Sequence, residues 1–240
     1  MPEQTAIRLW PEDADPEYVR ARSQLVSAER RLKDAIEEVA RARRGLGPGT
    51  PLPEYVFDEG PRDLAAAEPT TRPTLADLFG PHDTLLTYHL MYAADAAQAC
   101  PMCSMWVDGW HGVSHHLARH AGLAVIAKAP LPRLRAWGRQ RGWHGLRLVS
   151  SSGNTFNSDL NMENEGGQRP GVSVFTREGS LVRHWYSAQA SFSQDEPERG
   201  IDLLCVTWSL LDLLPQGRRD WYASNDYAGA ERGERWAQGE

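Results

Sequence analysis

Two cysteines separated by two residues, Cys100-Pro101-Met102-Cys103, constrain this chain more than any other feature. An apolar run at 85–91 precedes them and suits a buried strand. Pro101 suits the first position of a helix, where the amide that proline lacks would have no partner. The sequence therefore predicts a strand, a short loop and a helix with Cys100 as its N-cap. Because a helix start favours negative charge, we expect the Cys100 sulfur to face the amides of Met102 and Cys103.

This placement predicts a redox pair. The thiolate is the form of cysteine that attacks a disulfide, and a helix start stabilises it. Cys103 falls one turn into the helix, within disulfide reach of a rotated Cys100 side chain. Cys100 is then the nucleophile and Cys103 the resolving thiol; the alternative is a half-buried pair without chemistry. Cys205 lies on the apolar face of a predicted helix, where we expect it to fill the core.

Zinc is the other chemistry that nearby residues allow. The downstream histidines are His111, His115, His116 and His120. In a straight helix, His111 would lie about 12 Å along the axis from Cys103, too far to share one ion. A bend at Gly109 or Gly112 would be needed to fold these histidines back. No metal and no cofactor is therefore expected, and a zinc site stays open as an alternative.

The apolar runs predict an α/β fold with a central mixed sheet flanked by helices. The expected strands are 55–57, 85–91, 123–127, 146–149, 172–175 and 181–185, and the expected helices of this region begin near 101, 132 and 201. Alternating strands and helices favour a parallel sheet, to which the final hairpin adds an antiparallel edge. The last helix is expected to end before Pro215.

A long helix is predicted before this domain. Asp15-Pro16-Glu17 is typical of a helix start, and glycines from Gly45 end the helix. Apolar or small residues recur in a heptad pattern at Tyr18, Ala21, Leu25, Ala28, Leu32, Ala35, Val39 and Ala42. Such a helix either packs on its own domain or joins two copies as a homodimer. The expected organisation is a helical arm at 1–49, a domain at 50–215 and a polar tail at 216–240.

Composition excludes several classes of protein. The chain has 240 residues and a net charge of −6, which argues against nucleic acid or anionic membrane as a partner. No apolar window approaches the roughly 18 residues of a membrane span, and no export signal is visible at the N-terminus. Three cysteines do not make a disulfide framework, so the cytoplasm is the expected compartment.

Several short motifs carry a family resemblance. They are Thr87–Met91, Cys100–Trp106, Lys128–Leu131, Gly142-Trp143, Ser150–Asn157, Gly171–Phe175 and Gly200–Asp202. Over about 16–218, the chain resembles the bacterial thioredoxin-like proteins catalogued as domain of unknown function 899. The resemblance implies a thioredoxin-like fold and a dithiol–disulfide oxidoreductase with a protein or small-molecule thiol or disulfide as substrate. A binding module or redox sensor on the same fold is the alternative.

Several residues near the dithiol are candidates for further roles, and one of them, Pro170, comes from the likeness to thioredoxin-like folds. Pro170 precedes a predicted strand as the cis-proline of thioredoxins does, and would present a free backbone edge to substrate. Tyr88, Trp106 and Trp110 are candidates for an apolar rim that binds substrate, with buried packing as the alternative. Asp108 and His89 are candidate proton carriers.

Two departures qualify the resemblance. Residues 191–197 look like a variation or insertion before the closing helix. Peroxiredoxins place proline and threonine seven and three residues before the reactive cysteine, where this chain has Ala93 and Ala97. The peroxide pocket of that related class is therefore not expected.

Overall fold

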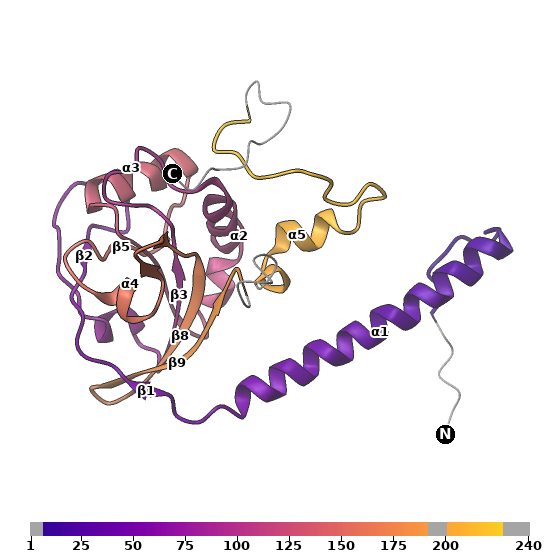
Figure 1. The fold of residues 1–240 in the computed structure, drawn as a ribbon, viewed down its shortest axis with the longest axis horizontal. Helices are drawn as coiled ribbons and strands as arrows, with labels where there is room; N and C mark the ends of the chain where they lie inside the picture. Colours follow the sequence, from indigo (N-terminus) through magenta and orange to yellow (C-terminus); the bar gives the residue numbers. More distant parts are fainter. Residues whose placement is uncertain (1–6, 192–200, 228–240) are drawn as a thin grey trace. The chain divides into compact units, whose positions relative to one another are not determined.

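The chain divides into two compact units, 1–47 and 48–240. A computed structural model describes residues 7–191 and 201–227, with helix α1 in the first unit and the sheet in the second (Figure 1). The finer subdivision expected at 50 and 216 stays a prediction.

Helix α1 (Pro16–Arg44) begins and ends where the sequence predicts. Asp15 is the N-cap, and its Oδ1 accepts hydrogen bonds from the amides of Glu17 (2.7 Å) and Tyr18 (3.4 Å). Gly45 is the C-cap. None of the α1 residues is buried.

The second unit is built on a mixed seven-stranded sheet within the described residues. Its strands are β1 (Thr50–Pro51), β2 (Asp58–Glu59), β3 (Thr84–His89), β4 (Gly122–Ala127), β5 (Leu148–Ser150), β8 (Gly171–Glu178) and β9 (Leu181–Gln189), in the order β1-β9-β8-β3-β4-β5-β2. β6 (Glu163–Asn164) and β7 (Gly167–Gln168) pair separately. The helices are η1 (Ala76–Phe79), α2 (Pro101–Leu117), α3 (Leu131–Arg141), α4 (Phe156–Asp159), η2 (Asp202–Leu204) and α5 (Val206–Leu211).

The pairing pattern confirms the expected fold class. β3, β4 and β5 are parallel neighbours, and β8 and β9 add an antiparallel hairpin on the other side of β3. Parallel strands need crossovers, which α2 and α3 provide. A central mixed sheet flanked by helices, with α2 following the central strand, is a thioredoxin-like fold.

Alternation along the strands gives the sheet two separate cores. One core contains Tyr88 and the inner faces of α2 and α3, so both long helices of this unit cover the same face. The other core contains Phe156, Phe175 and the segment around Phe57 and Phe79. Successive strand residues point to opposite faces, so neighbouring positions of β3 serve different cores.

Two sequence predictions differ from the structure, and a third falls almost entirely on residues that the structure does not describe. The expected strand 55–57 contributes only an isolated bridge between Val56 and Thr74, and the strand pairing falls on β2. The expected closing helix is broken into η2 and α5, with Cys205 at the N-cap of α5. The proposed insertion 191–197 lies, except for residue 191, outside the described residues.

Candidate dithiol site

The two cysteines lie at the start of α2, as the sequence predicts. Cys100 is the N-cap and Pro101 the first helical residue. The amide of Cys100 donates to the Met91 carbonyl at 2.9 Å, which connects the N-cap to the start of the loop that follows β3. The Cys100 carbonyl accepts from the amide and the hydroxyl of Ser104, at 2.9 and 3.0 Å. The backbone that carries the first thiol is therefore held on both sides.

The environment of Cys100 favours its thiolate. A hydrogen bond from the Cys103 thiol is the main cause of a lowered pKa at Cys100, and the backbone amides of Cys103 and Met102 lower it further. Burial acts in the opposite direction but does not prevail. The sulfur does not form a regular capping hydrogen bond. The two amides, donors without a partner inside the first helical turn, favour the thiolate through hydrogen bonding of less regular geometry.

Cys103 has the opposite character. Burial raises the pKa of its thiol well above the usual value, and the hydrogen bond and charge of Cys100 raise it further. A contact with the Tyr88 hydroxyl and the backbone at Met91 act to lower it. The pair therefore consists of one sulfur that gives up its proton readily and one that keeps it, as a nucleophile and a resolving thiol require.

Both thiols are reduced and little exposed. Cys100 is 6% exposed and Cys103 is 1% exposed. The C-terminal segment contributes Ile201, Trp208 and Ala223 to the same apolar cluster. Asn225 Nδ2 donates to the Ala99 carbonyl at 2.8 Å, beside the first cysteine. Residues more than 100 positions away in sequence therefore help to cover the dithiol.

The aromatic residues expected around the dithiol form a buried stack. The Tyr88 ring lies parallel to Trp106, with centroids 5.8 Å apart and an angle of 16°, and meets Trp110 edge-on at 5.7 Å. Tyr88 and Trp106 are 1% and 3% exposed. Trp106 and Trp110 also line an apolar cavity of about 370 Å³ between α2 and the η2–α5 segment. These rings lie behind the dithiol and beside this cavity, so they do not form an open rim.

Pro170 is half-buried and directly precedes β8. Gly171 pairs with His89 at the end of β3, so Pro170 lies at the sheet edge from which the loop to Cys100 starts. Its peptide bond is trans, since the cis bond found among the described residues is Glu68–Pro69. The correspondence with a cis-proline is therefore not met in this structure.

Neither candidate proton carrier faces the dithiol. His89 lies in the other core, where it stacks on Phe156 and its Nε2 bonds the Ser173 hydroxyl at 2.9 Å. Burial, followed by the nearby His184, lowers its pKa to about 3, so the ring is neutral. Asp108 is held by Arg141 and by the indole Nε1 of Trp143, at 2.7 Å. Its geometry is that of a clamp between α2 and the end of α3.

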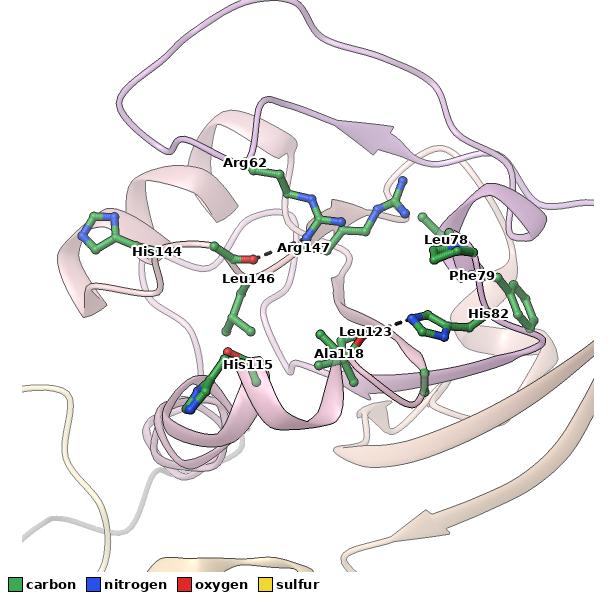
Figure 2. Close-up of a pocket in the computed structure, with 16 residues that line it drawn as sticks. Arg62, Leu78, Phe79, His82, His115, Ala118, Leu123, His144, Leu146 and Arg147 are labelled. Carbon is green, nitrogen blue, oxygen red and sulfur yellow. Dashed lines mark hydrogen bonds between the residues drawn. The ribbon is translucent and has the colours of Figure 1, made fainter.

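The histidines do not assemble into a metal site. α2 continues unbroken through both glycines to Leu117, and His111 Nε2 bonds the His144 carbonyl at 3.0 Å. Around a pocket of about 400 Å³, His82 bonds the Ala118 carbonyl, while His115 and His144 stand on separate walls (Figure 2). No group of three or more potential ligands occurs in the described parts of the chain, so the zinc alternative has no ligand set there.

Several contacts of the site left no recognisable signal in the sequence. Ser104 accepts from the Trp137 indole at 3.1 Å and so links the dithiol helix to α3. Its position four residues after Cys100 places both residues on the same helix face, but this spacing alone does not distinguish Ser104 from other residues of α2. Nothing local indicates the Met91 carbonyl or Asn225, because both contacts depend on tertiary packing.

The fold and the dithiol at the start of α2 define this chain as a thioredoxin-like protein. It belongs to the family described as "Bacterial protein of unknown function (DUF899)", whose sequence model matches residues 11–237. No curated protein matches the chain at a significant level.

Solved structures with a related chain path include redox proteins of three organisms. A proposed thioredoxin reductase from Burkholderia cenocepacia is 17% identical, with 67% of this chain and 97% of that chain covered and a TM-score of 0.47. An antioxidant protein (1-Cys peroxiredoxin) from Plasmodium falciparum is 15% identical, with 63% and 89% covered and a TM-score of 0.48. Enterococcus faecalis AhpC is 13% identical, with 68% of this chain and 90% of that chain covered and a TM-score of 0.45. At these values the likeness carries no conclusion about function. In the part of the chain that the structure describes, no helix is long and apolar enough to cross a membrane.

Proposed function

We propose that this protein is a thiol–disulfide oxidoreductase in which Cys100 is the nucleophile and Cys103 the resolving thiol. The observation that carries the proposal is the division of labour between the two sulfurs. The Cys100 pKa is lowered by the Cys103 thiol and the first amides of α2, whereas burial first of all raises the pKa of Cys103. One sulfur is thereby prepared to attack and the other to hold its proton until the second step.

The chemistry follows from that difference. The Cys100 thiolate attacks one sulfur of a substrate disulfide, so that a mixed disulfide forms and the other substrate sulfur leaves as a thiolate, which takes up a proton. Cys103 then loses its proton and attacks the Cys100 sulfur, which releases the second substrate thiolate to be protonated. The protein dithiol is oxidised to a disulfide, and the substrate is reduced to two thiols. Run in reverse, the same steps oxidise a substrate dithiol.

The proposed substrate is a protein or small molecule that carries a thiol or a disulfide. Trp106 and Tyr88 support its apolar part, since Trp106 lines the 370 Å³ cavity and Tyr88 stacks on Trp106. We further propose that an extended substrate pairs with the backbone at Pro170, which directly precedes β8 and adjoins the end of β3. We also propose the cytoplasm as its compartment, where thiols are kept reduced, and a homodimer formed through α1.

Reduction of insulin disulfides by the dithiothreitol-driven protein tests the proposal. We expect turnover by the wild type and none by Cys100→Ser. Cys103→Ser should accumulate a mixed disulfide, because its first step is intact and its second is removed. Ser114→Ala, near the far end of α2, is the control and should retain wild-type turnover.

The outcomes separate the proposal from its alternatives. Equal rates for wild type and Cys100→Ser would refute the oxidoreductase and leave a binding module. A reversible Cys100–Cys103 crosslink without any turnover would indicate a redox sensor. Stoichiometric zinc in freshly purified protein, lost together with activity in chelator, would support the metal alternative.

A further inference from the structure

Helix α1 carries an apolar heptad seam, and the large side chains of this seam are exposed. Every seventh residue is a large one, and Tyr18, Leu25, Leu32 and Val39 are 50%, 51%, 53% and 45% exposed. An alanine follows each of them by three residues, at Ala21, Ala28, Ala35 and Ala42. With large residues at a and alanine at d, the 29-residue helix has a continuous stripe about 43 Å long. Such a stripe is the surface with which helices supercoil around each other.

The residues that flank the seam indicate what covers it. The g positions are Glu17, Gln24, Arg31 and Glu38, and the e positions are Arg22, Glu29, Ile36 and Arg43. In a parallel pair, each g residue meets the e residue five positions later in the other helix. Glu17 would then meet Arg22, and Glu38 would meet Arg43. The remaining contacts, Gln24 with Glu29 and Arg31 with Ile36, place no like charges together.

An antiparallel pair would be opposed by the same charges. In that orientation g residues meet g residues and e residues meet e residues. If the midpoints of the two seams coincide, so that position 25 lies opposite position 35, the nearest set of g and e positions places Arg31 opposite Arg31 and Glu29 opposite Glu29. The next set places Glu17 against Glu38 and Arg22 against Arg43. Neither set contains a pair of opposite charges.

We propose that α1 binds α1 of a second copy of this chain as a parallel, in-register, two-stranded coiled coil. The charge pattern is complementary to itself in this one orientation, which is why the partner is another copy. Ile36, 48% exposed at an e position, widens the apolar contact. The inference goes beyond the redox proposal and does not depend on it.

A crosslink at an a position tests the orientation in the full-length chain. Leu25→Cys should form a disulfide with the same position of the second copy on oxidation, because a residues face each other in register. In an antiparallel pair, position 25 lies opposite position 35 and the link fails. Ser23→Cys, on the outer face of the helix, is the matched control and should not crosslink. Mass spectrometry of the linked peptide distinguishes this bond from links through the native cysteines.

Charge reversal tests the same orientation without a covalent bond. In sedimentation equilibrium, Glu38→Arg and Arg43→Glu should each raise the dimer Kd about tenfold, since two symmetric attractive pairs become repulsive. The double variant should restore the wild-type Kd. Circular dichroism checks that α1 remains helical in each variant. A monomer at all concentrations, or a tighter dimer of Arg43→Glu, would overturn the proposal.

Discussion

Tyr88 interacts with Cys103, the resolving thiol of the proposed mechanism. Its hydroxyl is buried, interacts with Cys103 and acts to lower the Cys103 pKa. No hydrogen bond of regular geometry to another group satisfies this hydroxyl. The sulfur is therefore the group to which its proton can be directed when Cys103 becomes negative.

Tyr88→Phe should make the second step slower. Without the hydroxyl, the pKa of Cys103 rises further, so the resolving thiolate is less populated at neutral pH. We expect a several-fold longer lifetime of the mixed disulfide, with the attack by Cys100 little changed. Stopped-flow measurement of both steps checks this. Tyr55→Phe is the matched control, because that buried tyrosine lies in the other core and bonds Asp159.

His89 makes stability depend on pH. Its pKa is about 3 in the folded protein against an ordinary value of 6.5, so below about pH 6.5 the unfolded chain binds a proton that the folded chain does not. The free energy of unfolding therefore falls as the pH is lowered from about 6.5 towards 3, by at most about 1.4 kcal/mol per pH unit from this residue. His184, whose pKa is also lowered by burial, acts in the same direction.

Urea unfolding of His89→Gln between pH 4.5 and 8 tests this assignment. The variant loses the bond to Ser173 and should be less stable at pH 8. The difference in the free energy of unfolding between wild type and variant should become smaller as the pH falls, because the unfolded variant has no histidine at position 89 to take up a proton. If the free energies of unfolding of wild type and variant changed equally with pH, His89 would not be the source of the pH dependence.

At the scale of elements, local signals in the sequence predicted the three long helices α1, α2 and α3 and the strands β3, β4, β5, β8 and β9. Asp15 with Pro16 and Cys100 with Pro101 mark the starts of α1 and α2, where capping and proline act within one turn. The break at Cys205 was not predictable in this way. The apolar period continues through it, and the edge-on contact of Trp208 with Trp221 at 5.6 Å is a tertiary feature that this period does not encode.

Asp108 is an element-scale residue because it joins α2 to α3. Asp108→Asn keeps an acceptor for the Trp143 indole but loses the charge opposite Arg141. The carboxylate is 39% exposed, so we expect a loss of about 1–2 kcal/mol in the free energy of unfolding. Insulin reduction should remain unchanged. A fall in turnover with unaltered stability would instead return Asp108 to the role of proton carrier.

At the scale of the whole molecule, the cover over the dithiol is the feature that sequence reasoning missed. The tail from 216 is expected from its sequence to be polar and either docked or loose, and no contact near the dithiol is predicted for it; in the structure Asn225 donates to the Ala99 carbonyl and to Gln98 Oε1. A contact between residues 126 positions apart leaves no local period or motif. The peptide bond before Pro170 is trans, which is the common state of an X–Pro bond. The dithiol itself was predictable because the two cysteines and the proline that opens α2 lie within one helical turn.

Asn225→Ala should make the first thiol easier to reach. Loss of the bond to Ala99 loosens the segment that contributes Ala223 to the cluster around Cys100. We expect iodoacetamide to alkylate Cys100 several-fold faster at a fixed pH, with an unchanged Cys100 pKa. Asn164→Ala, in the β6–β7 ribbon, is the control. An unaltered alkylation rate would mean that other residues limit access.

The alternation of β3 has a consequence for the conditions under which such a protein works. Tyr88 faces the sulfurs and His89, one residue later, faces the opposite layer. Lowering the pH therefore reduces the stability of the fold through His89 in one layer. Raising the pH increases the fraction of Cys103 thiolate beside Tyr88 in the other layer. Two adjacent positions of one strand thus respond to opposite ends of the pH scale, His89 through the stability of the fold and Tyr88 through the charge state of Cys103.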